Sequence, residues 1–365
     1  MSIFYIIIPI QLVLFVALAM APYVTRKSEN FGVKTPEEQF SSPEMCALRR
    51  RYVWQCGLSA IAFTIPAVAA FLLGMDEFWS SMLYVGCVLA LIAVMFLFFL
   101  RARRTVLRRK AEENWTYERP QVVSGSTVPL GKMASSLWVL IPSLLAVAAA
   151  LWIGYERYPS MPDTVATHWD LQGNPDGFSG KSLWLIWMMP AFQLFMTLLF
   201  TGIVVMFRVT RRQLDSADPK ESLRRSHLFR QSWTVFLIAL GNLLILSFTF
   251  IQAAIFELAD AMAVTYATLG VAGAAVIAAI ALSLAVGQGG SRLRPPAKSV
   301  AIDRDDDRHW KLGSFYYNPD DPSVFVEKRF GVGMTCNFAR PLTWVLTGLL
   351  VLVIAAVIAL PFILS

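Results

Sequence analysis

The chain alternates long apolar runs with shorter polar and charged segments. A helix needs about 20 apolar residues to cross the ~30 Å hydrocarbon core of a bilayer, and eight runs are close to that length. We therefore predict an all-α polytopic membrane protein with about eight transmembrane helices. The predicted spans are residues 3–22, 53–73, 78–100, 137–155, 183–207, 234–256, 261–286 and 342–364.

Composition agrees with this class, because 56% of the 365 residues are hydrophobic and 16% are charged, against roughly 25% charged in soluble domains. We interpret the first run as an uncleaved anchor, since no basic residue precedes it whereas Arg26 and Lys27 follow it. None of the eight apolar cores contains Asp, Glu, Lys, Arg or His. Ion-coupled carriers and intramembrane hydrolases keep ionisable groups at depth, so we predict a non-enzymatic protein without a cofactor.

The basic residues predict how the chain is oriented. Thirty of the 32 Lys and Arg residues lie in the four loops that follow the odd-numbered spans. Because such loops remain in the cytoplasm, we predict a plasma-membrane protein with both termini extracytoplasmic. The other two, Arg157 and Lys181, lie in the outer segment 156–182. The outer segments then carry a net charge of −6 and the inner segments a net charge of +13.

The order of spans and loops divides the chain into five predicted segments. Three helices with two basic loops come first, then two helices flanking segment 156–182, then a basic helix with two spans, then a small cytoplasmic domain, then the last helix. These segments are residues 1–136, 137–207, 208–286, 287–341 and 342–365. In the small domain, two aromatic runs flank Asn318-Pro-Asp-Asp-Pro322, which predicts a β-hairpin pairing across this loop.

Few polar residues lie at depth in the predicted spans. Gln193 and Asn242 are interpreted as interhelical hydrogen-bond partners, because an amide in hydrocarbon is costly unless a neighbouring helix pairs with it. The span 261–286 is rich in Gly and Ala. Small side chains let helix backbones approach closely, so we predict that this span packs in the middle of the bundle.

Segment 156–182 ends in Gly180-Lys181-Ser182, which is the end of a phosphate-loop pattern. Pro175 occupies the place of the required glycine, and a membrane span follows, so nucleotide binding is not predicted. The stretch 164–171 is instead typical of a β-strand, and Asn174-Pro-Asp-Gly177 is typical of a type I turn.

The outer segment also carries the candidate site. His168 and Asp170 would share one face of the strand and form a small polar cluster with Asp176. One alternative is an ordered cap over the bundle, and another is a metal bound by these three residues, which we leave open. The tentative ligand-binding residues are His168, Trp169, Asp170, Asn174, Asp176 and Lys181.

Two stretches resemble known families. YPSMPDTVATHWDLQGNPDGFSGKS closely resembles the extracytoplasmic segment of an SdpI-related family of bacterial membrane proteins, with the pattern Y-P-x-x-P-D-x-(V/I)-x-x-H-(W/F)-(D/N)-x-x-G-x-P-D. DRHWKLGSFYYNPDDPSVFVEKRFGVGMTCNFARP resembles a cytoplasmic domain of unknown function that accompanies it in Gram-positive bacteria. The first resemblance implies a membrane family that includes an immunity protein against a secreted peptide toxin, which also takes part in signalling.

Two classes of function therefore stay open. The leading hypothesis is immunity or envelope signalling, in which the acidic outer loop meets a cationic extracytoplasmic peptide and the inner segments meet a cytoplasmic protein partner. The alternative is a small-molecule or lipid transporter or exporter. The lipid bilayer is a further partner, and nucleic acid is not, because no segment has base-reading spacing.

The orientation predicts which residues an impermeant thiol reagent reaches. In a cysteine-free background, Asn174→Cys should react in intact cells, whereas Asp320→Cys should react only after the cells are opened. Labelling of position 320 alone in intact cells would reverse the predicted topology.

Overall fold

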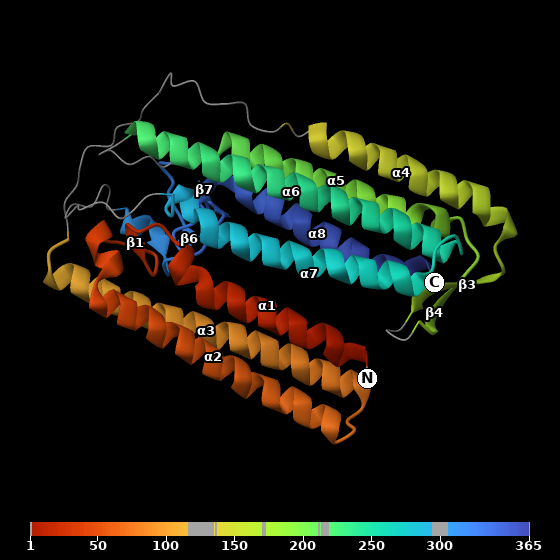
Figure 1. Cartoon of the computed structure of the whole chain (residues 1–365), viewed down its shortest axis with the longest axis horizontal. Helices are drawn as coiled ribbons and strands as arrows, with labels where there is room; N and C mark the ends of the chain where they lie inside the picture. Colours follow the sequence, from red (N-terminus) through yellow and green to blue (C-terminus); the bar gives the residue numbers. More distant parts are fainter. Residues whose placement is uncertain are drawn as a thin grey trace. The chain divides into compact units, whose positions relative to one another are not determined.

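The computed structural model describes residues 2–115, 135, 137–169, 173–210, 212, 219–293 and 306–364. The described residues form eight α-helices, and each predicted span coincides with one of them (Figure 1). The helices are α1 Ser2–Val24, α2 Pro43–Leu72, α3 Glu77–Glu112, α4 Leu137–Arg157, α5 Trp184–Val209, α6 Pro219–Ile255, α7 Ala261–Val286 and α8 Pro341–Leu364.

Six of these helices, α2 to α7, are long and apolar enough to cross a membrane. In α1 and α8, the described apolar stretches Gln11–Val24 and Pro341–Leu352 are shorter. The prediction of a mainly helical fold is therefore confirmed, and the six apolar helices are consistent with the predicted multi-pass membrane protein.

Short polar side chains fix where several helices begin. Ser42 Oγ accepts a hydrogen bond from Met45 N at the start of α2, and Asp76 Oδ1 accepts from Phe78 N and Trp79 N at the start of α3. Asp260 Oδ1 accepts from Ala263 N at 2.7 Å at the start of α7. These bonds satisfy amide groups that have no partner within the helix.

The chain forms two compact units, each assembled from separate stretches of sequence. Unit 1 contains residues Met1–Pro129, Arg211–Phe229 and Leu282–Thr343. In this unit α2 packs along α3, and α1 packs on both. Aromatic rings join the helices to two polar segments, with ring centroids 5.4 Å apart for Phe31 and Tyr52 and 4.4 Å apart for Phe99 and Phe330.

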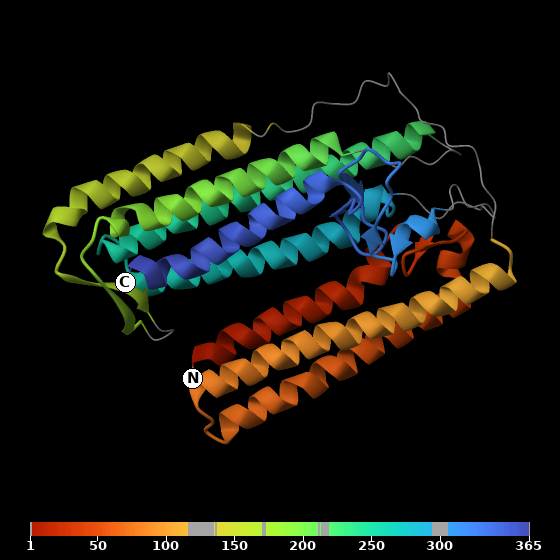
Figure 2. The same cartoon turned by 180° about the vertical axis from the view of Figure 1, so that it is seen from behind.

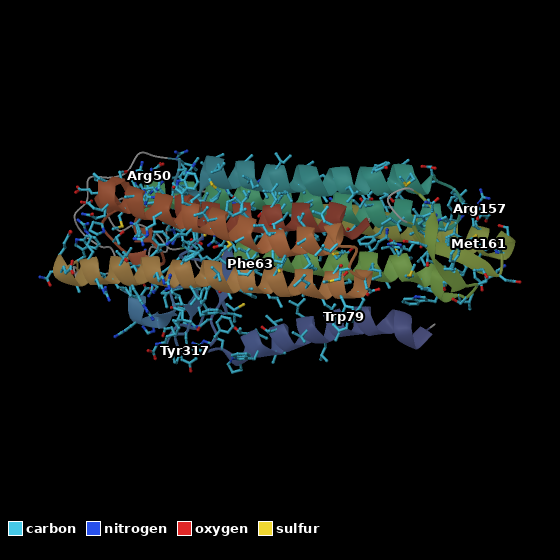
Figure 3. All side chains as sticks on the ribbon, turned by 90° about the horizontal axis from the view of Figure 1, so that it is seen from below. Arg50, Phe63, Trp79, Arg157, Met161 and Tyr317 are labelled. Carbon is cyan, nitrogen blue, oxygen red and sulfur yellow. The ribbon has the colours of Figure 1, made fainter. Side chains whose placement is uncertain are left out.

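The two ends of unit 1 differ in structure. Arg50 and Tyr317 lie toward one end and Trp79 toward the other, with Phe63 between them (Figure 3). The short hairpins of this unit gather at the first end, whereas the start of α1 and the turn between α2 and α3 lie at the second (Figure 2).

The small segment before α8 contains two hairpins, so the predicted pairing across Asn318–Pro322 is wrong. β5 (Trp310–Lys311) pairs with β6 (Phe315–Tyr316), and β7 (Phe325–Glu327) pairs with β8 (Met334–Cys336). The intervening loop is instead held by Asn337, whose Nδ2 donates to the carbonyl oxygens of Asn318 and Asp321. These side-chain hydrogen bonds hold the loop in a fixed conformation. Each strand therefore pairs with the strand next to it on the other side, β6 with β5 and β7 with β8.

A further hairpin, which was not predicted, occupies the segment between α1 and α2. β1 (Glu29–Asn30) pairs with β2 (Val33–Lys34) through a turn in which Phe31 and Gly32 have φ of 48° and 72°. Two positive φ values are typical of the tight turns that match the twist of paired strands.

Unit 2 contains residues Leu130–Thr210, Arg230–Ala281 and Trp344–Ser365. Gln193 Nε2 donates to Ile245 O at 3.0 Å and to Thr249 Oγ1 at 2.7 Å, which links α5 to α6. Asn242 Nδ2 donates to Trp138 O at 2.8 Å, which links α6 to α4. The predicted interhelical role of both amides is confirmed.

The prediction that span 261–286 lies in the middle of the bundle is wrong. Among the described residues of α7, the buried hydrophobic side chains are Val264 and Val286, and most of the others are exposed or half-buried. Lipid tails are as apolar as a protein interior. A small-residue composition therefore permits close packing without requiring it.

The contact between α4 and α5 depends on Gly154. A Cβ at this position would lie 2.9 Å from Ile186 Cγ2 and 3.2 Å from Ile186 Cα, whereas a Cβ at Gly202 would meet nothing within 4 Å. We expect Gly154→Ala to destabilise unit 2 by about 1–3 kcal/mol through overpacking, and Gly202→Ala to be neutral. Thermal unfolding of both purified variants measures this difference, and equal midpoints would contradict the packing described.

Candidate functional site

The candidate outer site is a hairpin in unit 2 that joins α4 to α5. β3 (Thr164–Trp169) pairs with β4 (Pro175–Gly180), with Thr164 opposite Gly180 and Trp169 opposite Pro175. The predicted strand is confirmed, but the predicted turn at Asn174–Gly177 is wrong, because Pro175, Asp176 and Gly177 belong to β4. Proline is tolerated as the first residue of a strand, and the chain reverses before it, where Gly173 has a φ of 86°.

His168 and Asp176 meet on the exposed side of this hairpin. The distance from His168 Nδ1 to Asp176 Oδ1 is 2.5 Å, and the two side chains are 72% and 47% exposed. With an ionised carboxylate and a neutral imidazole, His168 donates from Nδ1 to Asp176 and leaves the Nε2 lone pair available to another donor. In that state the pair presents hydrogen-bond acceptors and one negative charge to its surroundings.

Glycine at position 177 allows this arrangement. Gly177 stands opposite His168 where the strand register shifts, and a Cβ at position 177 would lie 2.8 Å from His168 Cβ. Any larger residue would push the histidine away from its partner. The pairing of His168 with Gly177 across the two strands thus positions the His168 side chain as well as its backbone.

The other side of the hairpin rests on unit 2. Trp169 packs against a buried cluster that includes Val165, Ile186 and Phe256. Lys181 Nζ donates to Met161 O at 2.8 Å and to Pro159 O at 3.2 Å, and lies 5.2 Å from the centre of the Tyr158 ring. Trp169 and Lys181, which were predicted to bind a ligand, therefore have contacts that hold the hairpin in place.

The remaining predicted site residues are placed less fully. Asn174 is exposed beside β4, and Asp170 lies outside the described residues. Within the part of the chain that the structure describes, no three His, Cys, Asp or Glu side chains are grouped to hold a metal ion. Because Asp170 is one of the three candidate ligands, the metal site stays a prediction.

Acidic side chains surround the hairpin end of unit 2. Arg157 and Met161 lie at this end, at the close of α4 and in the loop that follows (Figure 3). The exposed acidic residues are Glu156, Asp163, Asp176, Glu257 and Asp260. Arg157 is exposed as well, but Lys181 is held by carbonyl oxygens. Acceptors and negative charge thus dominate this surface.

A second candidate site is a buried group of charges in unit 1, which we call the Arg329 network. Arg329 is 1% exposed and forms ion pairs with both Asp306 and Asp307. Lys110 Nζ lies 2.7 Å from Asp307 Oδ2, and Lys34 N donates to Asp307 Oδ1 at 3.2 Å. The network consists of Lys34, Arg103, Lys110, Asp306, Asp307 and Arg329.

Arg103 connects the network to the β1–β2 turn and to strand β5. Its guanidinium donates to Gly32 O at 2.7 Å and to Trp310 O at 3.4 Å. A Cβ at Gly32 would lie 2.5 Å from Gly313 O, so the β1–β2 and β5–β6 turns touch directly. A side chain at Gly32 would separate the two hairpins, and a side chain at Gly313 would displace Arg103, so both positions need glycine.

A neighbouring group of charges extends the network. Lys34 Nζ pairs with Glu29 Oε1 at 2.9 Å, and Arg26 pairs with Glu327. Burial acts to raise the pKa of the Glu29 carboxyl, but the positive charges of Lys34, Arg26 and Arg329 outweigh it, and the pKa is lower than its ordinary value. Glu29 therefore stays ionised at neutral pH although it is buried.

The Arg329 network was not foreseen from the sequence. The run DRDDDRHW has the composition of a solvated charged loop, and the partners of its aspartates lie 22 and 197 residues away. Pairing over such separations leaves no local spacing pattern. One feature of the sequence could have indicated a buried ion pair, namely the cation Arg329 beside the apolar residues Phe325, Val326 and Phe330.

Each of the two sites overlaps a match to a family profile. The profile of a domain of unknown function (DUF1648) matches residues 144–194, which include the β3–β4 hairpin. The profile of a family of unknown function (DUF5808) matches residues 319–344, which include Arg329 and Asn337. No curated protein and no solved structure matches the chain. The resemblance to the SdpI-related family stays a prediction.

The Arg329 network predicts a large effect of a single substitution. Arg329→Met leaves two buried carboxylates without their main partner, which should cost about 3–5 kcal/mol. We expect the segment 306–340 to become sensitive to protease in the purified full-length protein. Lys328→Met is the matched control, since it removes the same charge from the adjacent, exposed residue. Equal protease resistance of the two variants would contradict a structural role for the network.

Proposed function

We propose that this chain is a non-enzymatic plasma-membrane protein that recognises a cationic peptide outside the cell, in an immunity or envelope-signalling role. In this proposal segment 156–182 is extracytoplasmic and the β5–β8 segment is cytoplasmic, with both termini outside. The single observation that carries the proposal is the exposed His168–Asp176 pair on a hairpin whose other side is fixed to the bundle.

The chemistry of the hairpin end suits a cationic ligand. A lysine or arginine side chain can donate to the free oxygen of Asp176 and to His168 Nε2 at the same time. The exposed carboxylates of Asp163 and Glu257 add to the negative potential that attracts such a ligand. Phe178, which is 62% exposed on β4, offers an apolar contact beside these charges.

The opposite face of the membrane would meet a protein partner. The β5–β6 hairpin exposes three apolar side chains, Leu312, Phe315 and Tyr317, near the exposed basic residue Lys311. A rigid surface of this kind supports binding with little loss of conformational entropy. The Arg329 network supplies that rigidity, because it ties the hairpin to α3.

A small-molecule or lipid transporter is the alternative. It would need polar groups that face a path through the helices. In unit 2 the amide nitrogens of Gln193, Asn242 and Gln252 donate to backbone or side-chain oxygens of neighbouring helices. Their hydrogen bonds serve helix packing, so peptide recognition is the function that we favour.

The proposal predicts that cells depend on His168 and Asp176 when challenged with a cationic antimicrobial peptide. Deletion of the gene should increase sensitivity, and a chain with His168→Ala and Asp176→Asn should fail to restore resistance although it reaches the membrane. Thr164→Ala, on the same strand and also exposed, should restore resistance fully and serves as the control. Unchanged sensitivity of the deletion strain across a broad panel of peptides would remove the immunity role.

A further inference from the structure

The end of α3 that projects beyond its apolar core carries a stripe of exposed arginines. Arg101, Arg104 and Arg108 fall within a sector of about 60° around the helix, given 3.6 residues per turn, and all three are exposed. The opposite face of the same turns is buried, with Ala102, Val106 and Lys110 turned into unit 1. The stripe therefore faces the surroundings of the protein.

The neighbouring helix α2 adds two arginines at the same level. Arg109 Nη1 lies 3.8 Å from Glu44 Oε2, which fixes the register of the α2–α3 pair. With this register, Arg50 and Arg51 stand level with Arg101 to Arg104, and both are exposed. We call Arg50, Arg51, Arg101, Arg104 and Arg108 the arginine face.

Apolar residues follow directly below these cations. On α2, Trp54 is 71% exposed one turn from Arg50, and Leu58 is exposed one turn further. On α3, the exposed Leu97 lies one turn from Arg101. Along these helices a cation is followed by a tryptophan and then by an aliphatic side chain. The same order of chemical groups is met on passing from the lipid headgroups into the hydrocarbon of a membrane.

The arginine face forms no ion pair with an acidic side chain in the described part of the chain, and its nearest carboxylate along α3 is the exposed Glu112, one turn from Arg108. Arg109 pairs with Glu44 and Glu113, and Lys110 pairs with Asp307. None of the five face arginines has a carboxylate within ion-pair distance among the described residues, and Arg101 lies 5.9 Å from the centre of the Phe98 ring. Five like charges so close together repel one another unless anions lie between them.

We propose that the arginine face binds the phosphate headgroups of anionic phospholipids in the adjacent leaflet. The stripe spans about 10 Å along α3, at a rise of 1.5 Å per residue, which matches the depth of a headgroup layer. Guanidinium groups pair with phosphate through two parallel hydrogen bonds, and Trp54 anchors the boundary with the acyl chains. The proposed binding applies whichever leaflet this end of unit 1 occupies, so it is independent of the peptide-recognition role.

The test is native mass spectrometry of the full chain titrated with phosphatidylglycerol or phosphatidylcholine. We expect the wild type to bind phosphatidylglycerol about tenfold more tightly or better, since each basic residue near anionic lipid contributes on the order of a fivefold gain. Arg101→Gln, Arg104→Gln and Arg108→Gln together should abolish this preference, and the matching Arg→Lys triple should keep most of it.

A second triple variant controls for the loss of charge. Arg157→Gln, Lys311→Gln and Lys328→Gln remove three exposed cations elsewhere and should leave the lipid preference unchanged. Equal affinity of the wild type for the two lipids would overturn the proposal, as would a preference that survives in the Arg→Gln triple. A face that instead binds a soluble acidic polypeptide such as polyglutamate, with no preference between lipids, would assign the arginines to a protein partner and also refute it.

Discussion

The structure of unit 1 depends on one buried cation. Removing an arginine from water costs several kcal/mol unless its charge and its donors are matched, and Arg329 is matched by Asp306 and Asp307. The carboxylate of Asp307 in turn needs Lys110 and the amide of Lys34. The segment before α8, the β1–β2 hairpin and the end of α3 must therefore come together for any of these charges to be satisfied, which makes the small hairpins an integral part of the three-helix unit.

The hairpin in unit 2 follows a different design. It buries few charges, and it is held by apolar packing of Trp169 and Val165 and by carbonyl oxygens around Lys181. Its polar residues remain at the surface, where His168 and Asp176 are paired but accessible. A fixed backbone with exposed hydrogen-bond acceptors favours ligand recognition, because few side chains or loop residues lose conformational freedom when the ligand binds.

Much of the fold could be predicted from the sequence. All eight helices were located, because a bilayer imposes a minimum length on each apolar run, and the roles of Gln193 and Asn242 follow from the cost of burying an amide. Strand pairing was harder. Pro175 begins a strand instead of a turn, and β6 and β7 do not pair with each other because the side chain of Asn337 holds the loop between them. The His168–Asp176 pair was predictable because its residues are close in sequence, whereas Arg329 meets partners that only the folded chain brings near.

The most direct test of this account is a double-mutant cycle between Lys110 and Asp307. The single variants Lys110→Met and Asp307→Asn and the combined variant would be unfolded in parallel, with the protease resistance of segment 306–340 as the measure. A coupling energy of about 1–3 kcal/mol, as residues of one buried network show, is the predicted result. Additive effects of the two substitutions would show that the network does not hold this segment to α3.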